Sequence, residues 1–322
     1  LHLTMGIKTP PTMNTAEVTN RGFELTVGWK DHVGDFNYAV STNFSYNHNE
    51  VTKYLGKYEA GWVEKDGKKV WQSNIGDVSV DKDKGRIVEG HPIKEYYTLN
   101  TYSGNGTHFN SDGSVNINGG PKDGMIRTEG DMKWLNAMID AGYKFMPNQS
   151  VGRNNIYYGD LIYADLNGDG IYGSSYDYDF QGSSAMPKFG YGINISASWK
   201  NFDLSMLWAG NGGFKLYWEE DPYNSVAIRN GFATSERVAN DHYFYDPENP
   251  TDSRTNLNGY IPRLVENSKQ SRQTSNYYLY NGTYMKLKNL TIGYTLPVTL
   301  TEKISAERVR VYLSGENLFT IT

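Results

Sequence analysis

The sequence predicts an all-β protein whose long antiparallel strands are suited to crossing a membrane as part of a β-barrel. Three observations support this fold class: runs that alternate in polarity, a high content of Tyr and Gly, and long polar segments between the predicted hairpins. Alternation indicates strands because successive side chains of a strand point to opposite faces. Each alternating run therefore carries one apolar face and one polar face.

The composition fits an exported β-rich protein. The 322 residues include 34 Gly, 26 Tyr and 7 Trp. Tyr favours strands and membrane–water interfaces, and Gly marks turns and bulges. Cysteine is absent, which excludes disulfides and thiolate metal sites. The net charge is −5 and no long basic run is present, which argues against nucleic acid as a partner.

The sequence contains no run of 18 apolar residues and so predicts no transmembrane helix. A spanning β-strand needs only about 9–11 residues of alternating character. The chain begins at Leu1 without a basic region and apolar core of the signal-peptide type, and it stops at Thr322 within a strand-like run. We therefore expect it to be an internal portion of a longer protein.

Three hairpins are predicted. The first joins residues 17–30 to 36–46, the second joins 189–199 to 202–208, and the third spans 284–319. Aromatic residues flank each turn, as an interfacial girdle requires, although aromatic residues favour strands in general. The flanking residues are Trp29 and Phe36, Trp199 and Phe202, and Tyr294 and Tyr312.

Two long polar segments separate the hairpins, at about 47–185 and 215–275. Short turns on one side and long loops on the other are typical of outer-membrane barrels, in which the long loops are extracellular. A soluble β-sandwich normally has short loops at both ends. Within the first segment, the pattern predicts a short helix over residues 132–140, with Asp131 as its N-cap and Gly142 as its stop.

Residues 165–170, with the sequence DLNGDG, resemble the first half of a calcium-binding loop. Tyr176 stands where an EF-hand has a bidentate Glu, so the second half departs from that pattern. A bound Ca²⁺ or Mg²⁺ and a metal-free turn held by side-chain-to-backbone hydrogen bonds both remain open. The candidate ligands are Asp165, Asn167, Asp169, the carbonyl of Ile171, Asp177 and Asp179.

The sequence carries no catalytic motif. Its six histidines lack metal-ligand spacing, and neither a Gly-x-Ser-x-Gly elbow nor a phosphate-binding loop is present. A glycosidase needs two carboxylates that face each other across a sugar, whereas neighbours such as Glu219 and Glu220 point apart in a strand. We therefore expect no enzyme activity.

Aromatic residues in the predicted loops are candidates for substrate contact. They lie among Asp, Asn and Glu residues, so their rings could stack on sugar faces while amides and carboxylates bind hydroxyls. The same set suits a peptide or a protein lid, and the alternative is that the rings pack the loops together. The candidates are Trp62, Trp71, Tyr217, Trp218, Tyr223, Tyr243 and Tyr245.

Five motifs, in order, resemble SusC/RagA-type TonB-dependent transporters, which are outer-membrane importers of Bacteroidetes. The strongest resemblance lies in the terminal hairpin, with KLKNLTIGYTLP followed by RVRVYLSGENLFT. The other motifs are NRGFEL from Asn20, GHPI from Gly90, GDLIYADLNGDG from Gly159 and MPKFGYG from Met186.

The resemblance implies that residues 1–322 are the C-terminal portion of a 22-stranded barrel, without its plug domain and last strand. It also implies a place in the bacterial outer membrane, a SusD-like surface lipoprotein as partner, energy from TonB, and uptake of oligosaccharides or peptides. The alternative is a soluble or surface-anchored all-β glycan-binding module. Strands of ten or more residues favour the barrel, whereas strands of about five to six favour a sandwich.

In the barrel interpretation the polar strand faces line the lumen and the apolar faces meet lipid. The predicted lumen residues are Thr26, Asn37, Ser41, Asn43, Asn194, Ser196, Lys286, Lys288, Arg308 and Arg310. The predicted lipid-facing residues are Leu25, Val27, Val40, Ile193, Ile195, Leu290, Ile292, Val309 and Val311.

Overall fold

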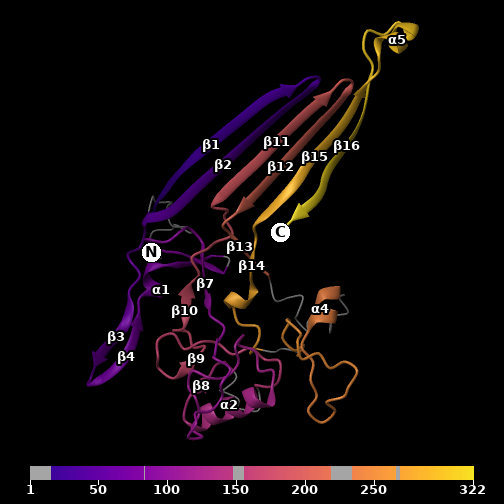
Figure 1. Cartoon of the computed structure of the whole chain (residues 1–322). Helices are drawn as coiled ribbons and strands as arrows, with labels where there is room; N and C mark the ends of the chain where they lie inside the picture. Colours follow the sequence, from indigo (N-terminus) through magenta and orange to yellow (C-terminus); the bar gives the residue numbers. More distant parts are fainter. Residues whose placement is uncertain (1–15, 83, 148–155, 219–233, 266–268) are drawn as a thin grey trace, which may run out of the picture.

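The computed structural model describes residues 16–82, 84–147, 156–218, 234–265 and 269–322. Its largest element is a six-stranded antiparallel sheet in the order β1-β2-β11-β12-β15-β16. In Figure 1 the six strands form a tilted slab above a more irregular body. The strands are β1 (Glu17–Val33), β2 (Phe36–Lys53), β11 (Phe189–Trp199), β12 (Phe202–Gly212), β15 (Tyr284–Thr295) and β16 (Arg310–Ile321).

The strand lengths decide between the two predicted architectures. The shortest strands of this sheet have 11 residues and the longest has 18. These lengths match strands that span a membrane and are about twice those of an ordinary sandwich. The all-β, barrel-type fold class and all three predicted hairpins are therefore confirmed.

The three hairpin connections lie together at one end of the slab, at the top of Figure 1. Gly34 and Asp35 alone connect β1 to β2, and the φ of 59° at Gly34 is one that glycine adopts without strain. Lys200 and Asn201 alone connect β11 to β12. Residues 296–309 connect β15 to β16 and contain the short helices α5 (Val298–Thr301) and η6 (Glu302–Ile304).

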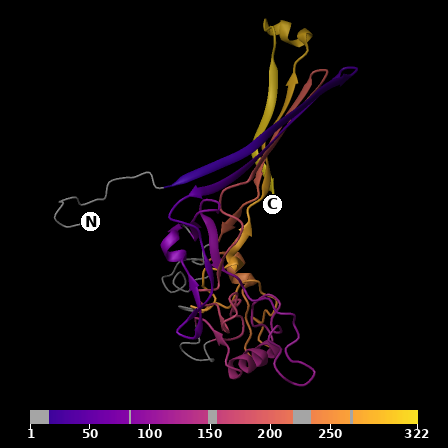
Figure 2. The ribbon, with the colours of Figure 1, turned by 90° about the vertical axis from the view of Figure 1, so that its left-hand side faces the viewer.

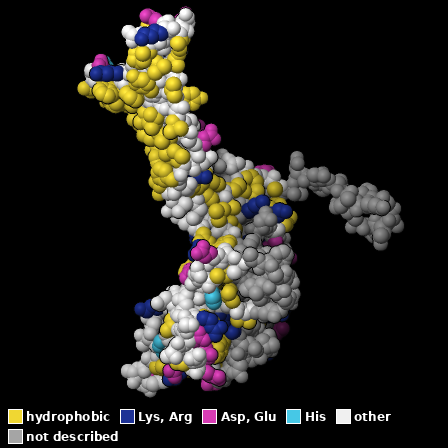
Figure 3. All heavy atoms as spheres, turned by 90° about the vertical axis from the view of Figure 1, so that its right-hand side faces the viewer, with side chains coloured by type: hydrophobic (Ala, Val, Ile, Leu, Met, Phe, Trp, Pro, Cys, Tyr) yellow, Lys and Arg dark blue, Asp and Glu magenta, His cyan; other side chains and the backbone are white. Residues whose placement is uncertain are grey.

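One face of the sheet is apolar across all six strands. The register places Leu25 opposite Phe44 and Ile195 opposite both Val40 and Met206, and opposed residues share a face. Leu25 and Val40 are exposed and the other three are partly exposed, and Figure 3 shows hydrophobic atoms gathered in a column along the strands. An apolar surface of this extent needs a partner or a membrane to cover it.

The apolar residues predicted within the strands share that face, and the predicted Val309 lies in the connection before β16. Among the predicted lumen residues, Arg308 lies in the same connection and Lys288 at a β-bulge. The remaining predicted lumen residues share the opposite face. These are Thr26, Asn37, Ser41, Asn43, Asn194, Ser196, Lys286 and Arg310.

Aromatic rings border the apolar face at both ends. Near the turns, the rings of Phe202 and Tyr294 lie 4.7 Å apart, and Trp199 is opposite Phe202. Near the loops, Tyr46 and Phe189 lie 5.6 Å apart. The ten-residue rise from Phe189 to Trp199, at about 3.3 Å per residue and a tilt of about 40°, gives a band about 25 Å tall, as in outer-membrane barrels.

The structure corrects one predicted girdle residue. Tyr312 is opposite Gly293, whereas Tyr294 is opposite Val311. Tyr312 therefore lies on the polar face, and the girdle at this hairpin contains Tyr294 alone.

At the other end of the slab, residues 54–188 and 213–283 fold together into what we call the loop body, as far as the structure describes them (Figures 1 and 2). The predicted loop at 47–185 begins later, because β2 continues to Lys53. The strands of the loop body are β3 (Ala60–Lys65), β4 (Lys68–Ser73), β5 (Val80–Lys82), β6 (Gly85–Ile87), β7 (Glu95–Leu99), β8 (Lys144–Phe145), β9 (Ile171–Tyr172), β10 (Tyr178–Phe180), β13 (Lys215–Tyr217) and β14 (Leu279–Asn281). Its helices are α1 (Ile75–Val78), α2 (Glu129–Asp140), α4 (Glu236–Asp241) and η5 (Asn276–Tyr278).

The loop body has a hydrophobic core of its own. Trp134, Leu135 and Met138 of α2 are fully buried against Phe145, and residues from both long loops complete the cluster. The predicted helix is therefore present, but it begins earlier than predicted. Thr128 is its N-cap and Asp131 is the third helical residue, and the two side chains form a capping box.

Among the residues that the structure describes, no helix is long and apolar enough to cross a membrane.

Candidate functional site

Two side chains clamp the sheet by crossing a neighbouring strand over a glycine. On the polar face, Arg310 of β16 reaches over Gly293 of β15 and donates from Nε to Asp203 Oδ1 of β12 at 2.9 Å. A Cβ at Gly293 would lie 2.4 Å from the Arg310 guanidinium, so a larger residue would block this ion pair. On the apolar face, the Tyr191 hydroxyl donates to the Tyr284 carbonyl at 2.9 Å, across β12. Both clamps join three strands and hold the wall in register.

The predicted cation loop is a turn whose carboxylates bind backbone N–H groups. Asp165 accepts hydrogen bonds from the N–H groups of Gly168 at 2.7 Å and Gly170 at 2.8 Å. Asn167 Oδ1 accepts from Asp169 N, and Asp169 Oδ1 accepts from Ile171 N. Bonds of this kind are what the metal-free interpretation requires.

Asp177 closes the same turn from its far end. The side chain is fully buried and accepts hydrogen bonds from Leu166 N at 2.8 Å and Ser174 N at 2.7 Å. Burial raises the pKa of the Asp177 carboxyl above its usual value, and the hydrogen bonds from Leu166 and Ser174 oppose this effect. The carboxylate therefore fixes the path of the chain over residues 165–177.

A bound Ca²⁺ or Mg²⁺ at this turn stays a prediction, and the structure shows where the remaining candidate ligands lie. Asp179, the remaining carboxylate of the predicted set, is exposed on β10 and accepts from Phe180 N. Within the described ranges, no three acidic or histidine side chains converge on a point where an ion could sit. A calcium site needs six to eight oxygen ligands at 2.3–2.6 Å, typically including several carboxylates.

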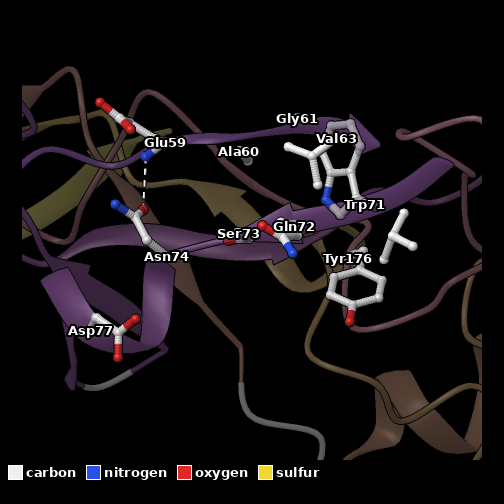
Figure 4. Close-up of a pocket in the computed structure, with 11 residues that line it drawn as sticks. Glu59, Ala60, Gly61, Val63, Trp71, Gln72, Ser73, Asn74, Asp77 and Tyr176 are labelled. Carbon is white, nitrogen blue, oxygen red and sulfur yellow. Dashed lines mark hydrogen bonds between the residues drawn. The ribbon is translucent and has the colours of Figure 1, made fainter. Parts of the chain in front are cut away.

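Trp62 and Trp71 are directly opposed in the β3–β4 hairpin, and their rings meet edge to face at 5.7 Å. The Trp62 indole donates from Nε1 to the Asn167 carbonyl at 2.9 Å, which docks the hairpin onto the Asp165–Asp177 turn. A cleft of about 690 Å³ lies beside the hairpin and is lined by Trp71 and Tyr176 (Figure 4). The structure thus brings the predicted metal loop and two predicted substrate-binding residues together.

Tyr217 ends β13 and Trp218 follows it, and both pack against other rings. Tyr217 is 6.0 Å from the ring of Tyr278, and Trp218 meets Tyr280 edge to face at 5.4 Å. The guanidinium of Arg237, from α4, lies 5.1 Å from the centre of the Trp218 ring. These two predicted residues therefore join β13, β14 and α4.

The three remaining candidates for substrate contact, Tyr243, Tyr245 and Tyr223, differ in their surroundings. Tyr243 is 1% exposed, and its hydroxyl donates to the Arg127 carbonyl, so it packs in the core of the loop body. Tyr245 is partly buried and meets Tyr158 edge to face at 5.1 Å. Tyr223 lies outside the described residues.

Sequence reasoning missed the ion pair that ties the two long loops together. Asp160 is fully buried and accepts from Arg263 Nε and Nη2, each at 2.8 Å. The two residues are 103 positions apart in the chain. No local sequence pattern predicts such a pair, since a single Asp and a single Arg in polar loops usually remain solvated.

The comparisons with known proteins agree with this geometry. TonB-dependent receptor P3 of Formosa agariphila is 26% identical over 310 residues, which are 96% of this chain and 25% of the relative. The TonB-dependent receptor SusC of Bacteroides thetaiotaomicron is 22% identical over 97% of this chain and 24% of the relative. The chain thus spans about a quarter of the length of the curated relatives it matches.

Solved structures show the same fold. The RagAB peptide transporter superposes with a TM-score of 0.57 at 18% identity, over 96% of this chain and 26% of that chain. A second structure, of the RagAB peptide importer in its closed-closed state, gives a TM-score of 0.55 at 19% identity. No protein-family model matches the chain.

Long hairpins and an uncovered apolar face are features of a segment of an outer-membrane β-barrel, and the chain has the fold of part of the RagAB transporter and is similar to TonB-dependent receptors. The similarity to SusC and to the RagAB transporter extends over almost the whole length of this chain. The relatives named here are receptors and transporters.

Proposed function

We propose that the protein to which this chain belongs imports nutrients across the outer membrane, in the manner of SusC-type receptors. The observation that carries the proposal is the uncovered apolar face, bordered by aromatic rings at both ends of strands at least 11 residues long. Lipid covers such a face, and a water-filled lumen suits the polar face behind it. A soluble glycan-binding module would leave the apolar face without a partner.

In this proposal the chain forms part of the barrel wall and part of the extracellular opening, and it performs no chemical step. The polar residues of β2 and β11 line part of the lumen, and the loop body lies on the extracellular side. Among the described strands, β1 and β16 each pair with one neighbour only. Because lipid does not tolerate unpaired strand edges, further strands of the complete barrel would pair with both of them.

The proposed partners follow from the relatives. A SusD-like surface lipoprotein would cap the extracellular loops, and TonB would supply energy through a part of the protein outside this chain. The substrate is an oligosaccharide or a peptide, and the RagAB structures are of a peptide importer. The Asp165–Asp177 turn would serve the same mouth by holding the loop body in shape, with or without a cation.

The test is to isolate the native full-length protein from envelope fractions and to identify its co-purifying partners by mass spectrometry. We expect a detergent-dependent outer-membrane species roughly four times the 36.4 kDa mass of this chain, carrying a lipoprotein. Deleting its gene should abolish TonB-dependent growth on the imported nutrient. A species soluble without detergent would overturn the proposal.

A further inference from the structure

We propose that the cleft between the β3–β4 hairpin and the Asp165–Asp177 turn binds a neutral oligosaccharide, with Trp71 and Tyr176 as its stacking surfaces. This inference rests on the proposed import function and names the substrate class at its outer mouth. The Asp165–Asp177 turn is part of this proposed site, because Tyr176 of the turn lines the cleft.

The two walls of the cleft are held by separate contacts. The hydrogen bond from Trp62 Nε1 to the Asn167 carbonyl fixes the hairpin against the turn. On the turn itself, Ser174 Oγ accepts from Tyr176 N, and the adjacent buried Asp177 anchors the chain. Tyr176 is thereby presented with 48% of its surface exposed, and its hydroxyl makes no hydrogen bond to the described part of the chain.

Two adjoining cavities make up the cleft. The larger measures about 690 Å³ and the smaller about 290 Å³, and Trp71, Ser73 and Tyr176 line both. A combined space of this size falls within the range of small-molecule sites. Trp71 and Tyr176 therefore lie where the two cavities meet, at the centre of an extended site.

The larger cavity has an aromatic end and a polar end. Figure 4 shows Trp71 and Tyr176 at one side and Glu59, Asn74 and Asp77 at the other, with Gln72 between them. Asn74 is committed to the fold, since its Oδ1 accepts from Glu59 N at 2.8 Å. The side chains of Glu59, Gln72 and Asp77 make no hydrogen bond or ion pair within the described ranges, so they can receive a ligand.

This lining selects hydroxyl groups over anions. The carboxylates of Glu59 and Asp77 accept hydrogen bonds from sugar hydroxyls, and the Gln72 amide both donates and accepts. Aromatic ring faces pack against the C–H faces of a pyranose. Among the residues that the structure describes, no Lys or Arg lines the larger cavity. Arg86 lines the smaller one, but Asp81 neutralises it at 2.7 Å. A carboxylate of a uronic acid or peptide would meet like charge, which disfavours both.

The experiment uses the native full-length importer in detergent and calorimetric titration with hexasaccharides of α-1,4-glucan, β-1,3-glucan, β-1,4-xylan and β-1,4-mannan. A set of ten-residue peptides is titrated in parallel. Three variants follow: Tyr176→Ala, which removes the ring; Tyr176→Phe, which keeps it; and Phe109→Ala, which removes an exposed loop ring outside the cleft. Because Tyr176 is exposed and only its backbone N–H bonds to Ser174, its truncation leaves the turn intact.

We expect at least one hexasaccharide to bind, with about tenfold loss of affinity in Tyr176→Ala and wild-type affinity in the other two variants. Equal binding by Tyr176→Ala and wild type would overturn the site. Binding of peptides alone, or of no hexasaccharide, would overturn the substrate class. Neither result would contradict the import proposal, because membrane location, lipoprotein partner and TonB-dependent growth are measured independently of this cleft.

Discussion

The six-stranded sheet and the loop body use the same residue types in opposite ways. In the sheet, Val27 is 54% exposed and Leu313 is 77% exposed. In the loop body, Trp134 and Met125 are fully buried. The sheet therefore depends on its surroundings to cover its apolar side chains, whereas the loop body covers its own. The hydrophobic effect stabilises both regions, but lipid completes the burial in only one of them.

The polar contacts of the two regions differ as well. The sheet is held by backbone ladders, with a few side chains such as Arg310 and Tyr191 crossing strands. The loop body has short strands and depends on side chains to satisfy backbone groups, as at Asp165 and Asp177. A single side-chain deletion should therefore damage the loop body more than the sheet, while the sheet should be sensitive to the polarity of its apolar face.

The largest effect is expected from Arg263→Leu. This change leaves the fully buried Asp160 carboxylate without its bidentate partner, and breaking such a pair costs about 3–5 kcal/mol. The two long loops should separate, while the sheet persists. Limited proteolysis should cut the loop body, and heat-modifiable migration on gels should show that the barrel remains folded.

Arg254→Leu is the matched control for that prediction. Arg254 also pairs with an aspartate, Asp252, but its side chain is 72% exposed, so solvent replaces the lost contact. Its proteolysis pattern should equal that of the wild type. If Arg263→Leu resisted proteolysis as well as the wild type does, the Asp160–Arg263 ion pair would not be what holds the loops together.

The second prediction concerns the apolar face of the sheet. Ile195 lies midway along β11, and an arginine at mid-membrane on the lipid side of a barrel costs about 2–4 kcal/mol. Ile195→Arg should therefore lower the folded fraction in urea titrations carried out in lipid vesicles. The control is Asn194→Arg, one residue away on the polar face, which should shift the transition far less. Equal shifts for both variants would contradict the assignment of faces.

The sequence predicted the sheet well because alternation is a local signal. A run such as Phe189 to Trp199 shows its two faces without reference to any other strand. Tyr312 was misplaced because it was chosen for its aromatic ring, whereas alternation already puts it on the polar face with Arg310, two residues before it. The composition of the loops likewise suggested exposed turns, whereas Trp134 and Tyr243 lie in a core assembled from both loops.

Sequence patterns also failed to predict the contacts of the candidate site, because these contacts join distant parts of the chain. The DLNGDG motif indicated a structured turn. Its ligand pattern did not reveal that the carboxylates accept hydrogen bonds from backbone N–H groups. Tyr176, noted only as a departure from the calcium pattern, lines the cleft because the Trp62–Asn167 bond brings the hairpin to the turn. That contact joins residues 105 positions apart, and local spacing carries no information about it.

The smallest effect is expected from removing divalent cations, which compares the two interpretations of the Asp165–Asp177 turn. Because Asp165 and Asp177 already accept backbone N–H bonds, chelation by EDTA should shift the melting temperature of the loop body by less than about 1 °C. A site filled to 100 times its Kd would instead add about 2.7 kcal/mol, a shift of several degrees. A calcium-dependent rise of that size, abolished by Asp165→Asn, would show that the turn rearranges to bind the ion. Without such a rise, the carboxylates act as substitutes for backbone partners that a short, irregular loop cannot supply.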